Sequence, residues 1–205
     1  MPGIFFGPEE TKLHGVLRLS KNPGAPAVVI CHPHPQFGGS MDNNVVYGVE
    51  SAAIDAGFST LRFNFRGVGR SRGRFDNGFG EREDVKHAVD RLAEESGVGD
   101  VVVVGYSFGA VAGLPAAMEH PKVVAMAGVS PPTVMADFGY LADCEKPKLI
   151  IAGAADSFCD PKNLESLVKN QKDRFELFEG VDHFYIGHEA RVGRLVCEFI
   201  SSLTR

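Results

Sequence analysis

Residues 100–110 read Asp-Val-Val-Val-Val-Gly-Tyr-Ser-Phe-Gly-Ala. The four valines are β-branched and apolar, which is typical of a strand buried on both faces in a parallel sheet. The strand runs directly into Gly105-Tyr106-Ser107-Phe108-Gly109, and small residues that suit a helix follow. This pattern predicts a sharp turn from strand to helix, with Ser107 at its tip and a glycine two positions to either side where the backbones approach closely.

The predicted position of Ser107 also suggests chemistry. At the start of a helix the backbone N–H groups lack partners, so Ser107 and the N–H of Phe108 lie where a negatively charged oxygen is stabilised. Acyl transfer generates such an oxygen. A chain with 24 glycines can contain G-x-S-x-G by chance. Its place directly after an all-valine strand favours the catalytic interpretation.

The rest of the chain alternates between apolar strands and amphipathic helices. Further strands are predicted at 25–31, 59–65, 123–129, 148–153 and 174–179, and helices at 42–57, 81–95, 161–170 and 188–203. Residues 12–20 lie between turn signals and predict an antiparallel hairpin at the beginning of the sheet. This order predicts a mostly parallel sheet covered on both faces. Residues 129–146 lack clear periodicity and are too few to form a separate lid domain.

Composition narrows the class of protein. With 205 residues and 44 % hydrophobic content, the chain is predicted to form one domain spanning residues 1–205. A net charge of −5, without a basic stripe, argues against nucleic acid or an anionic membrane as a partner. No leader-like or membrane-spanning run occurs, so we expect a soluble, cytoplasmic protein. The four cysteines have no C-x-x-C spacing and are predicted to be buried free thiols. No oligomeric state is favoured.

A serine nucleophile needs a base, and the base needs a carboxylate to orient it. On this architecture the acid and then the histidine follow later strands. The loop after residues 148–153 contains Asp156 and Asp160. Asp160 precedes Pro161 at a helix start and suits an N-cap, which leaves Asp156 as the catalytic candidate. After the last strand comes His183, the predicted base, whereas its neighbour Asp182 is predicted to be solvated.

A second donor is needed for the oxyanion beside the N–H of Phe108. It should come from the loop after the first apolar strand, residues 32–40. Prolines 33 and 35 have no N–H, so the near donors are His34 and Gln36, and we favour His34. A metal-binding His-Pro-His pair is the competing interpretation, but the histidine spacings favour no metal site. The glycines of residues 67–73 do not match a nucleotide-binding loop, so we expect no cofactor.

Two further segments carry a family resemblance. Residues 32–43, His-Pro-His-Pro-Gln-Phe-Gly-Gly-Ser-Met-Asp-Asn, and residues 63–71, Phe-Asn-Phe-Arg-Gly-Val-Gly-Arg-Ser, accompany the G-x-S-x-G turn. With these motifs the whole chain resembles the α/β-hydrolase superfamily. It looks most like small lidless bacterial hydrolases related to dienelactone hydrolase and to Xaa-Pro dipeptidyl-peptidase-type enzymes. The resemblance implies a three-layer α/β-hydrolase fold without a lid domain and a triad of Ser107, Asp156 and His183.

The expected activity is that of a serine hydrolase, specifically a carboxylesterase acting on small, short-chain acyl esters. Dienelactone hydrolase has cysteine where this chain has Ser107, so the lactone substrate is not implied. A peptidase or thioesterase is the alternative within enzymes, because the same groups can serve either reaction. A non-catalytic binding protein on the same fold is the alternative outside enzymes. The presence of all three triad residues favours catalysis.

Overall fold

A computed structural model describes residues 3–22 and 24–203 of the chain. The described residues form an eight-stranded sheet in the order β1-β2-β4-β3-β5-β6-β7-β8. Its strands are β1 Ile4–Phe6, β2 Leu13–Arg18, β3 Ala27–Cys31, β4 Ser59–Asn64, β5 Val101–Tyr106, β6 Val123–Val129, β7 Lys148–Gly153 and β8 Arg174–Phe178. The strands β1 and β2 pair antiparallel, β2 also pairs antiparallel with β4, and β3 to β8 are parallel. The predicted N-terminal hairpin and mostly parallel sheet are confirmed.

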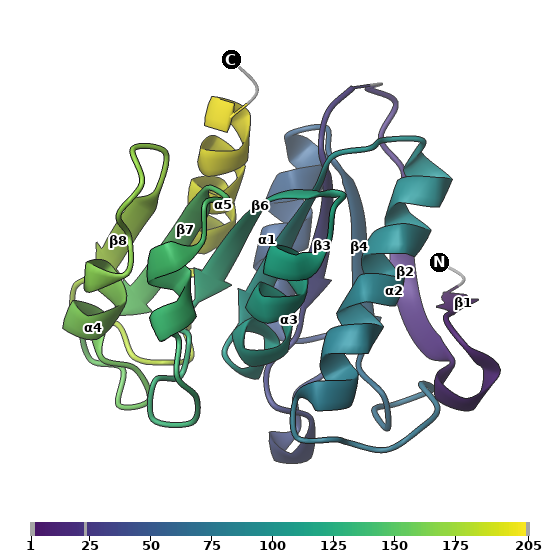
Figure 1. Ribbon diagram of the computed structural model, residues 1–205, viewed down its shortest axis with the longest axis horizontal. Coiled ribbons are helices and arrows are strands. Elements are labelled where there is room, and N and C mark those ends of the chain that lie inside the picture. The colour runs from purple at the N-terminus through teal and green to yellow at the C-terminus, as the bar shows by residue number, and fades with distance from the viewer. Residues whose placement is uncertain (1–2, 23, 204–205) are drawn as a thin grey trace.

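Helices cover both faces of this sheet. They are α1 Asn44–Asp55, α2 Phe79–Ser96, α3 Phe108–Glu119, α4 Pro161–Ser166 and α5 Glu189–Leu203, with short 3₁₀ turns at Glu9–Thr11, Pro35–Phe37 and Gly139–Asp143. Figure 1 shows α2, α3 and α4 in front of the sheet and α1 and α5 behind it. None of the helices within residues 3–22 and 24–203 is both long and apolar enough to cross a membrane.

The strand β5 lies at the centre of the core, as its valines predict. All six of its residues are buried. Because side chains alternate along a strand, Val101 and Val103 pack on the side of α2 and α3, while Val102 and Val104 pack on the side of α1 and α5. A strand that contributes to two cores must be apolar throughout, which explains the unbroken valine run.

Helices α1 and α4 are both shorter than predicted, and α1 spans Asn44–Asp55 where 42–57 was expected. Helix α4 ends at Ser166, not near residue 170. The backbone N–H groups of Lys169 and Asn170 donate to the carboxylate of Asp173, so they do not continue the helix. That carboxylate also pairs with the fully buried Lys148 at 2.7 Å. A long-range ion pair therefore ends the helix, although the local sequence would extend it.

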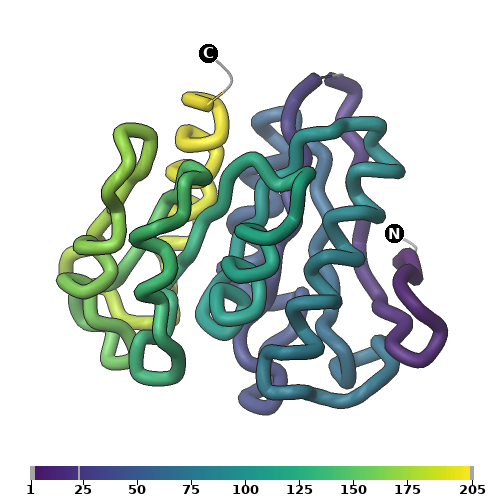
Figure 2. Tube along the Cα trace, in the orientation of Figure 1, coloured from purple at the N-terminus to yellow at the C-terminus, as the bar shows by residue number. Residues whose placement is uncertain are grey.

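The segment between β6 and β7 does not form a lid. Its 3₁₀ turn, Gly139–Asp143, packs against the α2 and α3 side of the molecule through the buried side chains of Phe138 and Leu141. Because the parallel strands run in one direction, the loops that follow them gather at one edge of the sheet, the lower edge in Figure 2. Polar side chains on those loops are consequently brought together over the ends of the strands.

Candidate active site

The turn between β5 and α3 has the geometry that its sequence predicts. Ser107 has φ 55° and ψ −120°, a conformation that non-glycine residues rarely adopt. A Cβ atom on Gly105 would lie 2.4 Å from the carbonyl oxygen of Gly109, and one on Gly109 would lie 2.3 Å from that of Cys31. Both positions therefore require glycine, because backbone atoms block any side chain. The turn holds Ser107 at the carboxyl edge of the sheet.

The structure brings the three predicted triad side chains together. Nε2 of His183 lies 2.8 Å from Oγ of Ser107, and Nδ1 of His183 lies 2.7 Å from Oδ2 of Asp156. The three residues come from the ends of β5, β7 and β8, and all are buried. Along the chain the order is serine, acid, histidine. In space one continuous line of hydrogen bonds runs from the serine to the histidine and on to the acid.

The charge state of Asp156 sets the direction of these bonds. Burial raises the pKa of Asp156, but hydrogen bonds from His183, from the Ser130 hydroxyl and from the N–H of Phe158 outweigh it, so the pKa lies below its ordinary value. An ionised carboxylate can only accept, so Nδ1 of His183 carries the proton. Nε2 is then free to accept from the hydroxyl of Ser107. This arrangement suits proton transfer away from the serine.

The loops that carry the acid and the base are tied to each other. The N–H of Ala155 donates to the carbonyl of Val181 at 3.0 Å, and a Cβ atom on Gly153 would lie 2.3 Å from that same oxygen. The hydroxyl of Tyr106, next to the serine, donates to the carbonyl of His183 at 2.7 Å. These contacts fix the position and orientation of the His183 ring relative to Ser107. As predicted, Asp160 caps α4 and Asp182 is exposed.

The predicted oxyanion donors are the N–H groups of Phe108, which follows Ser107 in the elbow, and of His34 in the loop after β3. The N–H of Ser107 itself is occupied by the carbonyl of Val129 at 2.9 Å. The ring of His34 packs against the ring of Phe108 at 4.8 Å, which places the two predicted donor residues side by side. The N–H of Gln36 donates to Nδ1 of His34 at 3.2 Å, so it is engaged within its own turn. The geometry favours His34 over Gln36 as the second donor.

The two histidines of the His-Pro-His segment have separate partners. Nδ1 of His32 bonds the carbonyl of Pro33 at 2.6 Å, and Nε2 accepts from the N–H of Phe65 at 3.0 Å. Both nitrogens of His32 are therefore used within the protein, which argues against the competing metal interpretation. Within residues 3–22 and 24–203, no three His, Cys, Asp or Glu side chains group closely enough to hold a metal ion. Instead, His32 fastens the loop after β3 to the end of β4.

Acidification is expected to weaken the fold through His32. Burial lowers the pKa of His32 from 6.5 to about 4 in the folded protein. Because the unfolded chain binds the proton more readily, stability contributed by neutral His32 is present above pH 6.5 and is lost as the pH falls towards 4. The loss should reach about 3 kcal/mol near pH 4. Urea unfolding measured across this range tests it. The variant His32→Gln should show a correspondingly shallower dependence on pH, and an unchanged slope would contradict the assignment.

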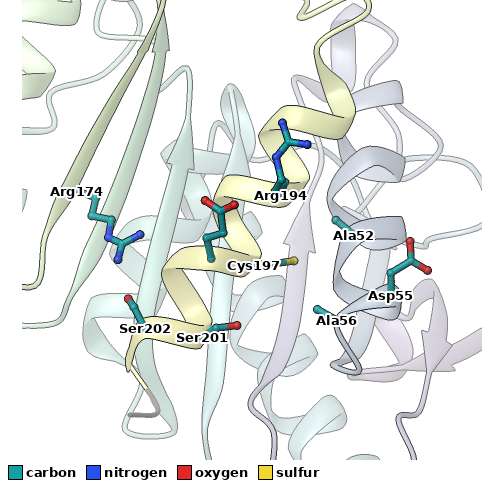
Figure 3. A pocket seen from close by; sticks show the side chains of 9 residues that line it. Ala52, Asp55, Ala56, Arg174, Arg194, Cys197, Ser201 and Ser202 are labelled. Carbon is teal, nitrogen blue, oxygen red and sulfur yellow. The ribbon is translucent and has the colours of Figure 1, made fainter.

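A hollow of about 560 Å³ lies away from the triad, at the amino edge of the sheet. Figure 3 shows its lining along α5, which carries Arg194 and Cys197, with Arg174 on one side of this helix and Asp55 of α1 on the other. None of the triad residues lines this hollow, so it takes no part in the chemistry considered above. At the triad, the exposed rings of Phe158 and Phe184 lie 4.7 Å and 5.9 Å from the ring of His183.

Sequence reasoning missed several residues that shape the site. It assigned no role to Tyr106, Ser130 or Tyr185, and it considered His32 only as part of a loop. Ser130 and Tyr185 are fully buried, and their hydroxyls lie 2.9 Å apart. Ser130 lies within the stretch without periodicity, residues 129–146, so no local signal marked it. Tyr185, two residues after the predicted base, could have been considered as a neighbour of the site.

Comparisons with known proteins agree with this fold. The family model described as the alpha/beta hydrolase fold matches residues 26–143. An uncharacterized protein of Rickettsia prowazekii, RP471, is 36 % identical over 90 % of this chain and 82 % of its own length.

Two solved structures are also similar. A protein of unknown function from Agrobacterium tumefaciens, described as an alpha/beta hydrolase, has 34 % identity and a TM-score of 0.89, covering 99 % of this chain and 96 % of that one. A serine hydrolase without lid from Xanthomonas campestris has 26 % identity and a TM-score of 0.85, covering 98 % of this chain and 94 % of that one. With the elbow, the sheet order and the absence of a lid between β6 and β7, these likenesses place the chain in the α/β-hydrolase fold family.

Proposed function

We propose that the protein is a serine carboxylesterase that hydrolyses small esters with short acyl chains through an acyl-enzyme intermediate. The observation that carries the proposal is the continuous line from Ser107 Oγ to His183 at 2.8 Å and from His183 to Asp156 at 2.7 Å. Three buried, hydrogen-bonded polar side chains that start from a serine with a strained backbone are not needed for stability, because apolar side chains could fill the same space.

The first half of the reaction forms the acyl-enzyme. His183 takes the proton of Ser107 on Nε2 while Oγ attacks the ester carbonyl. The carbonyl oxygen becomes an oxyanion, which accepts from the N–H groups of Phe108 and His34. His183 then gives its proton to the leaving alcohol as the carbon–oxygen bond breaks. Asp156 stays ionised throughout and stabilises the imidazolium that forms between the two proton transfers.

The second half regenerates the enzyme. Water enters on the side vacated by the alcohol, and His183 removes one of its protons as the oxygen attacks the acyl carbon. The same two N–H groups receive the second oxyanion. Collapse of the intermediate releases the carboxylic acid, and His183 returns its proton to Oγ of Ser107. No atom other than those of ester and water is consumed.

The absence of a lid between β6 and β7 supports a preference for short acyl chains. Without a lid, the apolar surface near the triad consists of isolated rings, among them Phe158, which lies 4.7 Å from the His183 ring and is 40 % exposed. Such a surface covers a small acyl group but not a long one. A series of p-nitrophenyl esters tests the proposal: acetate and butyrate should turn over fastest. A maximum at decanoate would contradict the chain-length preference, and absence of turnover throughout would favour the non-catalytic alternative.

The second oxyanion donor can be tested by removing one N–H group. The φ of His34 is −56°, which proline adopts without strain. His34→Ala removes the ring but keeps the N–H, and His34→Pro removes both. We expect the proline variant to be about 10²- to 10³-fold slower in kcat than the alanine variant. Equal rates in two variants with equal thermal stability would rule out the His34 N–H as a donor.

A further inference from the structure

Backbone strain in this protein gathers around the triad. Within residues 3–22 and 24–203, the non-glycine residues with positive φ are Asn77, Ser107, Ser130 and Tyr185. Ser107 is the elbow serine. Ser130 has φ 44° and Tyr185 has φ 54°, and both are completely buried. A bulky aromatic residue in this conformation is a clear outlier, and such strain persists where surrounding contacts over-determine it, often at functional sites.

The two strained residues contact each other through their hydroxyl groups. Ser130 follows β6, and its N–H donates to the carbonyl of Ile151 at 2.8 Å, which holds it next to the end of β7. Tyr185 lies two residues after His183, and its ring packs edge-on against those of Phe178 and Tyr106. Oγ of Ser130 and the hydroxyl of Tyr185 are 2.9 Å apart. The loop of the base and the segment after β6 are thereby joined.

The hydrogen-bonding capacity of Ser130 determines the direction of this link. We take its hydroxyl as a donor to the ionised carboxylate of Asp156, because a hydrogen bond from Ser130 is one of the causes that keep the pKa of that carboxyl below its ordinary value. A serine hydroxyl has one proton, so Oγ of Ser130 must accept the bond from Tyr185. The result is a second chain of hydrogen bonds that ends on Asp156, in addition to the bond from His183.

We propose that Ser130 and Tyr185 are positioning residues, and that the link Tyr185 to Ser130 to Asp156 holds the carboxylate in place against Nδ1 of His183. The proposal rests on the proposed function of the triad. Neither residue touches the substrate; both act through Asp156. Their positive φ values then have a purpose, because they direct two buried hydroxyls at one carboxylate.

The groups around Asp156 make its environment suitable for a pH measurement. The titratable groups that face it are His183 and Tyr185 from the loop after β8, Tyr106 from β5, and Cys159 from its own loop. Burial raises the pKa of both tyrosines and raises that of Cys159 to about 12. The charges of the exposed Asp160 and Asp182 lie farther out.

The test compares hydroxyl deletions in the full-length protein. In Ser130→Ala the Cβ atom and backbone strain remain, but the carboxylate loses a donor and attracts the imidazolium more strongly. We expect the acid limb of kcat/KM for p-nitrophenyl acetate to move up by about half a pH unit. We also expect kcat to fall about tenfold with little change in KM. Tyr185→Phe should act in the same direction but less strongly. The double variant should be no worse than Ser130→Ala, because both act through one link.

Matched controls separate this role from general stability. Tyr140→Phe removes a buried hydroxyl that has no partner among the described residues, and Ser166→Ala removes one that bonds only the carbonyl of Asn163. Neither should move the acid limb. An unmoved limb in folded Ser130→Ala, or additive effects in the double variant, would overturn the proposal. NMR titration of the His183 ring gives a readout independent of turnover. A moved titration in a protein without esterase activity would support the link and reject the proposed function.

Discussion

Replacing Ser107 with alanine is expected to lower kcat for p-nitrophenyl acetate by a factor on the order of 10⁶. The hydroxyl lies 2.8 Å from Nε2 of His183, so its removal leaves the base with no nucleophile to activate. Oxyanion donors and binding should leave a residual rate above that of water. Labelling by a fluorophosphonate probe, followed by mass spectrometry of the elbow peptide, should disappear in the same variant.

The comparison with His183→Ala makes this result specific. Because the two side chains act as a unit, each single variant and the double variant should be about equally slow. Alanine keeps the Cβ atom of Ser107 and thus the strained backbone, so the melting temperature should change little. Persistent labelling of Ser107→Ala would show that another residue is the nucleophile. Additive losses in the double variant would show that the serine and the histidine do not cooperate.

Replacing Gly105 with alanine is expected to disrupt folding. The new Cβ atom would lie 2.4 Å from the carbonyl oxygen of Gly109 and 2.6 Å from the N–H nitrogen of Ala110. Both are backbone atoms, so α3 would have to move away from β5. We expect a loss of about 3 kcal/mol or more in the free energy of unfolding, from overpacking together with distortion of the elbow. Urea denaturation followed by circular dichroism measures it, and the soluble fraction on expression is a second readout.

Gly99→Ala is the matched control. It lies just before the same strand, but a Cβ atom there meets nothing within 4 Å, and its φ is not in the left-handed region. Its effect should be within about 0.5 kcal/mol. If the variants at 105 and 99 were equally stable, close approach of strand and helix could not be the reason for glycine at the elbow. Loss of activity alone in Gly105→Ala would assign the glycine to geometry of the site, not to the fold.

Much of the fold could be predicted because local patterns coincide with tertiary requirements. The valine run of β5 reports burial on both faces, and the alternation of strands and helices reports a parallel sheet. The strands β6 and β7 occur where predicted, at Val123–Val129 and Lys148–Gly153. The end of α4 could not be predicted, because it depends on Asp173 and its buried partner Lys148. A contact between separate segments leaves no periodic signal in either of them.

Candidate site residues were likewise predictable where a local pattern marks them, and less so where the choice depends on the folded loop. Asp156 could be separated from Asp160 because an Asp-Pro pair is a local helix start, and the structure has Asp160 as the cap of α4. The choice between His34 and Gln36 depends on the turn itself, where the His34 ring accepts the Gln36 N–H. Local chemistry narrows the donors to two and favours His34, and the folded loop supports that choice because it engages the N–H of Gln36.

The sequence by itself determines the order of strands and helices, the serine on a glycine-flanked turn, and the acid and the histidine that follow later strands. These features are local, since each depends on periodicity, on residue type or on the turn chemistry of neighbours. Tertiary structure alone decided how His32 ties β3 to β4, and how Ser130 and Tyr185 meet beside Asp156. Those contacts join residues 55 and 33 positions apart, and their hydroxyls and imidazole look ordinary in sequence. Their significance comes from burial and backbone strain, which arise only when distant segments pack together.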